Sequence, residues 1–214
     1  MSLPHAYEPI LYADRREPFY VLEGVSGIGK STLTELLRRR LGASSLHTLH
    51  TPHSGWSPVA NGRLRPLPQF AFYLSGVLHA ADSVRQARTI SPVVADRYVS
   101  SVIACHSAVH RVALNEVRLL LGPFLPYLET PDHTFYLRSS EQVLRDRMTA
   151  KAADSNLTSD DAELFTVPGR LARLLDNFEA VADEDPTAVV LNTDGKTPDE
   201  LADWIINHVE AGRA

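Results

Sequence analysis

A ten-residue stretch, EGVSGIGKST (Glu23–Thr32), limits the fold of this chain more than any other feature. It follows a short apolar, β-prone run (Phe19–Glu23) and precedes a segment whose leucines fall on one face of a helix (Ser31–Leu41). A strand that passes through such a glycine-rich turn into a helix points successive backbone N–H groups at one spot. The positive end of the helix dipole faces the same spot. The stretch therefore predicts a phosphate-binding loop.

The spacing of this stretch fits G-x-x-x-x-G-K-S, the pattern of loops that bind nucleoside triphosphates. In this pattern Lys30 reaches the β and γ phosphates, and the Ser31 hydroxyl is a ligand for Mg²⁺. The residues expected to bind the triphosphate are Gly24, Val25, Ser26, Gly27, Ile28, Gly29, Lys30, Ser31 and Thr32. The loop by itself does not distinguish a kinase from a GTPase or a motor protein.

Strands and helices alternate along the rest of the chain. Further strands are predicted at 45–50, 89–95, 133–138 and 187–193, helices at 31–41, 69–87, 97–112, 115–122, 140–151, 162–182 and 197–210, and loops at 61–68 and 122–132. This alternation predicts an α/β fold in which helices cover both faces of a five-stranded parallel sheet. We expect residues 1–18 to form an N-terminal arm and residues 19–214 to form one domain with a short polar lid at about 150–161.

The composition of the chain restricts the kinds of partner that it can bind and the cellular compartment in which we expect it. The 214 residues carry a net charge of -5 without a basic block, which disfavours a nucleic-acid polymer as partner. No apolar run near the N-terminus is long enough for a signal peptide or a membrane span. A single cysteine excludes an intramolecular disulfide and fits a reducing, cytoplasmic environment. A small anionic substrate needs only a local basic pocket, which this balance of charge permits.

A second motif, VVADRYVSSVIA (Val93–Ala104), follows the predicted third strand. It places Asp96 at the carboxyl end of a buried strand beside the phosphate loop, where a carboxylate can hold Mg²⁺ directly or through water. The alternative is that Asp96 only caps the next helix. Arg97 begins that helix, and its guanidinium can bind a phosphate with two hydrogen bonds.

With both motifs in place, the sequence resembles the thymidylate kinase family and, more distantly, the deoxynucleoside kinases. The resemblance rests on E-G-x-x-G-x-G-K-S-T at 23–32 and D-R-Y-x-x-S-x-x-A at 96–104, which includes Ser101. It implies a three-layer P-loop kinase fold, ATP as phosphoryl donor, and a homodimer. It also implies that Arg97 contacts the acceptor phosphate and that an arginine near the lid stabilises the transferring group. Among Arg145, Arg147 and Lys151, we choose Arg145. The expected catalytic residues are Lys30, Asp96, Arg97 and Arg145.

The acceptor side departs from the family pattern. Thymidylate kinases usually carry Asp at the position of Ser26 and read R-E-P-G-G where this chain has His50–Ser54. They also carry an arginine on the long helix, about where this chain has Val77 and Leu78. Deoxynucleoside kinases read E-P-x-x-x-W at the same place, but their glutamate, the general base, would be Thr51. The residues expected to bind the acceptor are His50, His53, Trp56, Phe72, Arg97 and Ser101.

These departures leave the acceptor open. A thymidylate-like nucleoside monophosphate needs positive charge, which Arg63, Arg65 or Arg85 would supply unless they only line the surface. A hydroxyl acceptor, on a nucleoside or another small metabolite, needs a base, for which Asp96 and Glu23 are candidates. A third alternative is an ATP-binding regulatory or degenerate homologue. The spacing of His47, His50 and His53 would fit a zinc site, but these histidines straddle a strand and a turn, and the sequence favours a pocket instead.

Overall fold

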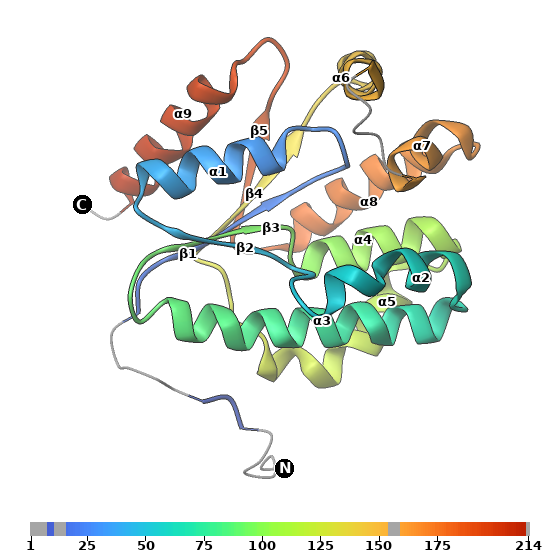
Figure 1. Cartoon of the computed structure of the whole chain (residues 1–214), viewed down its shortest axis with the longest axis horizontal. Coiled ribbons are helices and arrows are strands. Elements are labelled where there is room, and N and C mark those ends of the chain that lie inside the picture. The colour runs from blue at the N-terminus through green and yellow to red at the C-terminus, as the bar shows by residue number, and fades with distance from the viewer. Residues whose placement is uncertain (1–7, 11–15, 154–158, 213–214) are drawn as a thin grey trace.

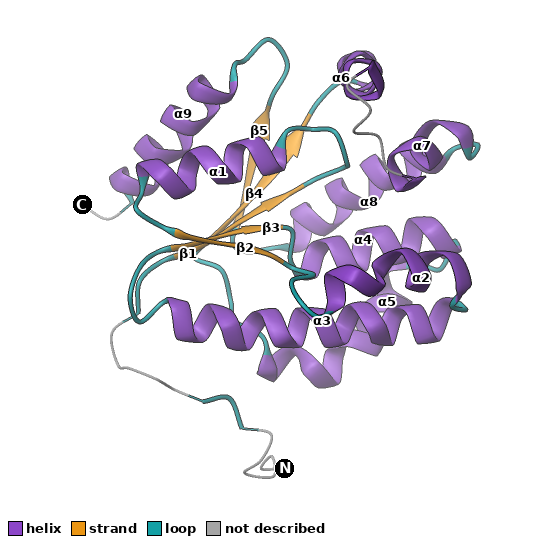
Figure 2. Ribbon diagram, in the orientation of Figure 1, coloured by secondary structure: helices purple, strands orange, loops and turns teal. Residues whose placement is uncertain are grey.

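Five parallel strands form the centre of the computed structural model, in the order β2-β3-β1-β4-β5 (Figures 1 and 2). The structure describes residues 8–10, 16–153 and 159–212. The strands are β1 (Phe19–Glu23), β2 (Ser44–His47), β3 (Val93–Asp96), β4 (His133–Arg138) and β5 (Ala188–Asn192). The helices are α1 (Lys30–Arg40), α2 (Ser57–Arg63), α3 (Pro66–Ala87), α4 (Val99–His110), α5 (Leu114–Leu121), α6 (Glu141–Ala153), α7 (Ser159–Thr166), α8 (Arg170–Glu184) and α9 (Pro198–Ala211), and 3₁₀ helices span His53–Trp56 and Gly122–Tyr127.

Helices cover both faces of the sheet. In Figure 1, α1 and α9 lie on one face, and α3, α4 and α8 lie on the other, with α5 packed against α4. Every residue of β1 and of β3 is buried, as expected for parallel strands that are covered on both sides. Burial of each large apolar side chain in this core contributes about 1.5–3 kcal/mol. The predicted α/β fold with a five-stranded parallel sheet is confirmed.

Several element boundaries agree with the sequence patterns. The strands β1 and β4 begin and end as predicted. The last helix is capped by Thr197, whose Oγ1 accepts from the backbone N–H of Glu200 at 3.2 Å. In return, the Glu200 carboxylate accepts from the Thr197 N–H at 2.7 Å, which completes a capping box.

Other boundary predictions were wrong, each for a local reason. Residues 61–68 are not a loop, because α2 ends at Arg63 and α3 begins at Pro66, where a proline fits the first helical turn. Residues 89–91 are not part of β3, since their N–H groups bond back to the end of α3. Strand β2 ends at His47 rather than at residue 50. The predicted loop 122–132 begins with a 3₁₀ helix.

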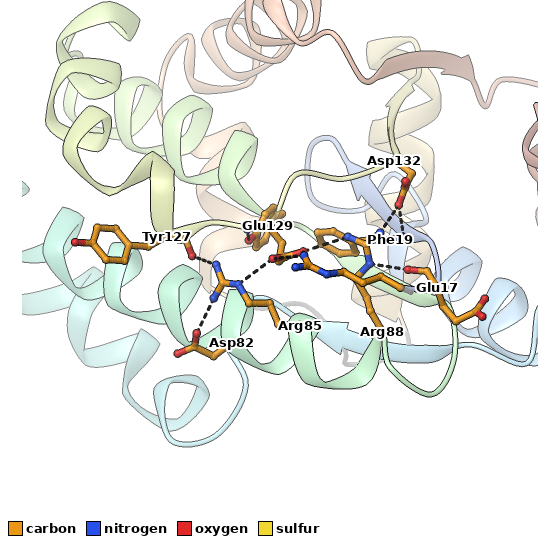
Figure 3. A network of polar contacts seen from close by, with 10 residues as sticks. Glu17, Phe19, Asp82, Arg85, Arg88, Tyr127, Glu129 and Asp132 are labelled. Carbon is orange, nitrogen blue, oxygen red and sulfur yellow. Dashed lines mark hydrogen bonds and ion pairs between the residues drawn. The ribbon is translucent and has the colours of Figure 1, made fainter. Parts of the chain in front are cut away.

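A buried network of arginines and carboxylates joins the end of α3 to the loop before β4 (Figure 3). Glu129 is 8% exposed, and its carboxylate accepts from Arg85 at 2.8 Å, from Arg88 at 3.1 Å and from Arg16 at 3.2 Å. Arg88 also donates to Asp132 at 2.9 Å. Removing one partner of such a buried network typically costs about 3–5 kcal/mol. The network therefore fastens α3, the loop before β4 and residue 16 to one another.

Much of the predicted arm and the middle of the predicted lid lie outside the described residues, at 1–7, 11–15 and 154–158. The arm, the lid and the division into a single domain therefore stay predictions. Across the described ranges, no helix combines the length and the apolar character needed to cross a membrane.

Candidate active site

The glycine-rich loop after β1 has the backbone shape that the sequence motif requires. Gly24, Gly27 and Gly29 have φ angles of 138°, 79° and 105°, a region that residues with a Cβ rarely adopt. At Gly24 a Cβ would also lie 2.9 Å from the backbone oxygen of Leu137 in β4. The loop therefore packs directly against β4 of the sheet, and it continues into α1.

Lys30 lies at the centre of this loop. Its side chain is only 5% exposed, and Nζ donates to the carbonyl oxygens of Gly24 at 2.9 Å and Val25 at 2.7 Å. Burial, and then the neighbouring charge of Arg97, lower the pKa of Lys30 to about 7. Phosphate oxygens beside Nζ would stabilise the charged ammonium again. This position suits a lysine that neutralises phosphate.

Ser31 and Asp96 form a pair that suits a magnesium ion. The Ser31 hydroxyl donates to Asp96 Oδ2 at 2.6 Å. The other carboxylate oxygen, Oδ1, is buried and has no hydrogen-bond partner among the described residues. A hydroxyl beside an unsatisfied carboxylate oxygen is the kind of donor set that Mg²⁺ prefers. Asp96 does not cap α4, so the alternative interpretation of this residue was wrong.

Glu23 holds the start of α4, a role that we did not predict. The side chain is fully buried, and Oε1 accepts from the backbone N–H groups of Tyr98 at 2.8 Å and Ser101 at 3.1 Å. Oε2 accepts from the Ser101 hydroxyl. Burial raises the pKa of Glu23, and these hydrogen bonds partly oppose the shift. The sequence feature that could have indicated this role is a glutamate at the end of an otherwise apolar strand.

Arg97 reaches back to the phosphate loop. Its φ of 71° is unusual for a residue with a side chain and carries a strain of about 1–3 kcal/mol. The guanidinium donates to the Gly24 carbonyl at 3.1 Å, to the Ser101 hydroxyl at 3.0 Å and to the Ser26 hydroxyl at 3.0 Å. Ser26, which departs from the family pattern, therefore helps to orient the arginine. The structure brings Arg97 and Ser101 together with the loop.

The other predicted acceptor residues lie away from the phosphate loop, on the segment after β2 and on α3. His50 stacks on His79 of α3 with ring centroids 4.1 Å apart, and His53 lies 5.7 Å from Phe72. The Trp56 side chain is 65% exposed. His47 does not join these rings, because its Nδ1 accepts from the backbone N–H of residue 49 at 3.2 Å.

The structure also separates the candidate arginines. Arg147 donates to the Ile28 carbonyl of the phosphate loop at 3.0 Å and to the Thr193 carbonyl at 3.1 Å. Arg145 instead pairs with Glu141 at 2.5 Å, so its catalytic role stays a prediction. Arg85 belongs to the buried network of Figure 3 and is unavailable to an acceptor.

Comparison of the sequence with known proteins finds one matching family and several related proteins. A sequence model of a family described as thymidylate kinase matches residues 22–193. The thymidylate kinase of Gluconobacter oxydans is 28% identical over 205 residues, which cover 89% of this chain and 93% of that protein. The thymidylate kinase of Mycoplasma pneumoniae is 26% identical over 174 residues, or 74% of this chain and 82% of that protein.

Solved structures share the fold. The thymidylate kinase from Candida albicans matches with a TM-score of 0.76 at 18% identity and covers 92% of this chain and 93% of that chain. The deoxyadenosine kinase from M. mycoides matches with a TM-score of 0.65 at 17% identity and covers 90% of this chain and 99% of that chain. At such identities the similarity concerns the fold alone, and it confirms the predicted P-loop kinase architecture.

Proposed function

The chain belongs to the thymidylate kinase family, and we propose that it transfers the γ-phosphoryl group of ATP to a thymidylate-like nucleoside monophosphate. Membership of the family makes the protein an ATP-dependent kinase. The observation that carries the proposal is the convergence of Lys30, Asp96 and Arg97 on one glycine-rich loop. These residues provide the cations and the carboxylate that phosphoryl transfer needs.

The chemistry follows from charge and position. Lys30 would neutralise the β and γ phosphates, because its ammonium lies within the loop that holds them. Ser31 and Asp96 would hold Mg²⁺, which supplies further positive charge on the phosphate oxygens when it is bound. Arg97 would orient the acceptor, and Glu23 and Ser26 keep its guanidinium and its helix in place. Catalysis of this kind depends on positioning and electrostatic stabilisation.

The described carboxylates favour a phosphate acceptor over a hydroxyl acceptor. A hydroxyl needs a base to receive its proton, whereas a phosphate monoester is already ionised. Of the two candidate bases, Glu23 accepts three hydrogen bonds and is fully buried. Asp96 is paired with Ser31 and suits the metal ion. Neither side chain is free to serve a sugar hydroxyl.

The partners and the compartment are also proposals. We infer that the substrate is a small molecule, that the enzyme works in the cytoplasm, and that it is a homodimer as the family resemblance implies. Exposed leucines on and after α5, at Leu119, Leu120 and Leu125, support an apolar contact surface there. Size-exclusion chromatography with light scattering would test the dimer.

Release of ADP from MgATP tests the function. The assay runs with dTMP and then with other nucleotides, with nucleosides and with small hydroxylated metabolites. Lys30→Ala should abolish turnover, whereas Arg39→Ala, which removes an exposed cation from the same helix, should leave it unchanged. Stimulation only by acceptors without phosphate would move the assignment to a hydroxyl kinase. Binding of ATP without stimulation by any acceptor would favour a regulatory protein.

A further inference from the structure

Three histidine rings pack together where the segment after β2 crosses α3. His50 and His53 come from this segment, and His79 comes from the helix. The ring centroid of His79 lies 4.1 Å from that of His50 and 5.6 Å from that of His53. Two of the rings are anchored through Nε2, since Nε2 of His50 lies 3.2 Å from the Ser83 hydroxyl and Nε2 of His53 lies 3.0 Å from the Ser75 hydroxyl.

The Nδ1 atoms of this histidine cluster (His50, His53 and His79) are buried. In each ring Nδ1 is buried and has no partner of hydrogen-bond geometry within the described part of the chain, although the backbone of His47 lies close to the His50 ring. A buried polar atom without a partner costs about 1–3 kcal/mol, so Nδ1 of His53 and Nδ1 of His79 in one cluster require an explanation. Each Nδ1 becomes an N–H donor when its ring is protonated, and anionic oxygens would then satisfy it.

Close packing builds the cluster into the fold. A Cβ on Gly76 of α3 would lie 2.5 Å from Leu49 Cδ2 and 3.6 Å from the His53 ring. The absence of a side chain at residue 76 therefore lets the segment after β2 lie directly on the helix. Two residues before His50, the Thr48 hydroxyl donates to the backbone carbonyl of Arg97. This bond joins the segment that carries the cluster to the arginine expected to bind the acceptor.

The surroundings of His50 and His53 disfavour a charged ring unless an anion is present. The titratable groups that face His50 are His79, His53 and His47, and His79 faces His53. Burial, followed by the repulsion of His79, lowers the pKa of His50 and of His53. No carboxylate of the described residues bonds to these rings, and the nearby Asp82 of α3 is paired with Arg85 at 2.7 Å.

We propose that the histidine cluster is the anion-binding wall of the acceptor pocket, and that it takes up a proton when a phosphate-bearing acceptor binds. The inference rests on the proposed function and deepens it. An imidazolium would supply the positive charge that this chain lacks at the positions of the family's acceptor-side arginines. Because that charge depends on protonation, the KM for the acceptor should rise with pH by up to about tenfold per unit, whereas the KM for ATP should not follow it.

Calorimetry of dTMP binding in two buffers with different ionisation enthalpies measures the proton directly. At about pH 7.5 the phosphate of dTMP is almost fully ionised, and binding to cations can only make it release protons. Net proton uptake by the wild-type protein would therefore come from the protein. We expect uptake that disappears in the triple variant His50→Asn/His53→Asn/His79→Asn. It should persist in His208→Asn, which removes a ring stacked on Trp204 of α9, on the opposite face of the sheet.

A gain-of-charge variant keeps the test decisive if the triple variant folds poorly. His50→Arg places a permanent cation at the wall, so it should bind dTMP without proton uptake and show a KM independent of pH. Turnover of dTMP with no proton uptake, or uptake that persists in both variants, would overturn the inference and leave the proposed function intact. If another phosphate-bearing acceptor is found, the same titration applies to it. Efficient turnover of an acceptor without phosphate would overturn both proposals.

Discussion

Replacement of Glu23 tests how the fold holds its catalytic arginine. In Glu23→Ala, two buried backbone N–H groups and the Ser101 hydroxyl lose their acceptor. Each unpaired group costs about 1–3 kcal/mol, and the cavity left by the side chain adds to that cost. We expect a loss of about 3–5 kcal/mol, which is a large part of the 5–15 kcal/mol that stabilises a typical domain.

Glu23→Gln separates the hydrogen bonds from the charge. The amide oxygen can still accept from Tyr98 and Ser101, and the amide nitrogen can donate to the Ser101 hydroxyl. Because burial raises the pKa of Glu23, removing the charge also relieves part of a desolvation penalty. The expected loss of stability is only about 1–2 kcal/mol. Activity should fall more, by about tenfold in kcat, since Arg97 loses the carboxylate behind it.

Urea unfolding and steady-state kinetics on the two variants distinguish these effects. Glu179→Gln, which removes a carboxylate that is 57% exposed, is the matched control and should change neither quantity. If the free energy of unfolding of Glu23→Ala were within about 1 kcal/mol of the wild-type value and kcat were retained, Glu23 would not hold the start of α4 and Arg97 in place.

Three further predictions follow from other contacts. Gly76→Ala should raise the KM for the acceptor and destabilise the fold by about 1–3 kcal/mol, because the new Cβ would clash with Leu49. Leu49→Ala should restore the KM in the double variant. If Gly76→Ala had the same effect with Leu49 and with Ala at residue 49, the packing of these two residues would not be the cause. Burial lowers the pKa of His106 to about 4, so its neutral form stabilises the fold above pH 6.5, and up to about 3 kcal/mol should be lost as the pH falls toward 4. Thermal unfolding from about pH 7 to 4 checks this, and a His106→Leu variant that is equally acid-sensitive would count against it. Arg147→Ala should raise the KM for ATP about tenfold or more, because the variant loses the contact between this side chain and the phosphate loop. Arg145→Ala should leave the KM for ATP unchanged, since Arg145 pairs with Glu141. If Arg145→Ala raised the KM for ATP and Arg147→Ala did not, Arg145 would be the arginine of the active site.

The sequence predicted the phosphate loop and its neighbours because their geometry is local. The strand, the three glycines and the following helix are contiguous, and glycine is the residue type that permits the positive φ angles of Gly24 and Gly29. The pairing of Ser31 with Asp96 required one further step, namely that parallel strands end at the same edge of the sheet. Alternation of strands and helices predicted the sheet for the same reason.

How the predicted acceptor residues pack could not be predicted, because it depends on contacts between distant segments. Nothing in the sequence shows that Arg85 meets Glu129, 44 residues later, rather than a substrate. The cluster of His50 with His79 depends on how closely a loop approaches a helix, which a glycine at residue 76 decides. Likewise, the role of Glu23 became visible only once its strand lay beside the start of α4.

The destination of the labelled phosphoryl group, when γ-labelled ATP, Mg²⁺ and dTMP are incubated with the enzyme, tests the proposed function most directly. We expect the label to appear in dTDP, and we expect Lys30→Ala to abolish the transfer. Label found only in inorganic phosphate, with dTMP unchanged, would contradict the assignment of this chain as a nucleoside monophosphate kinase.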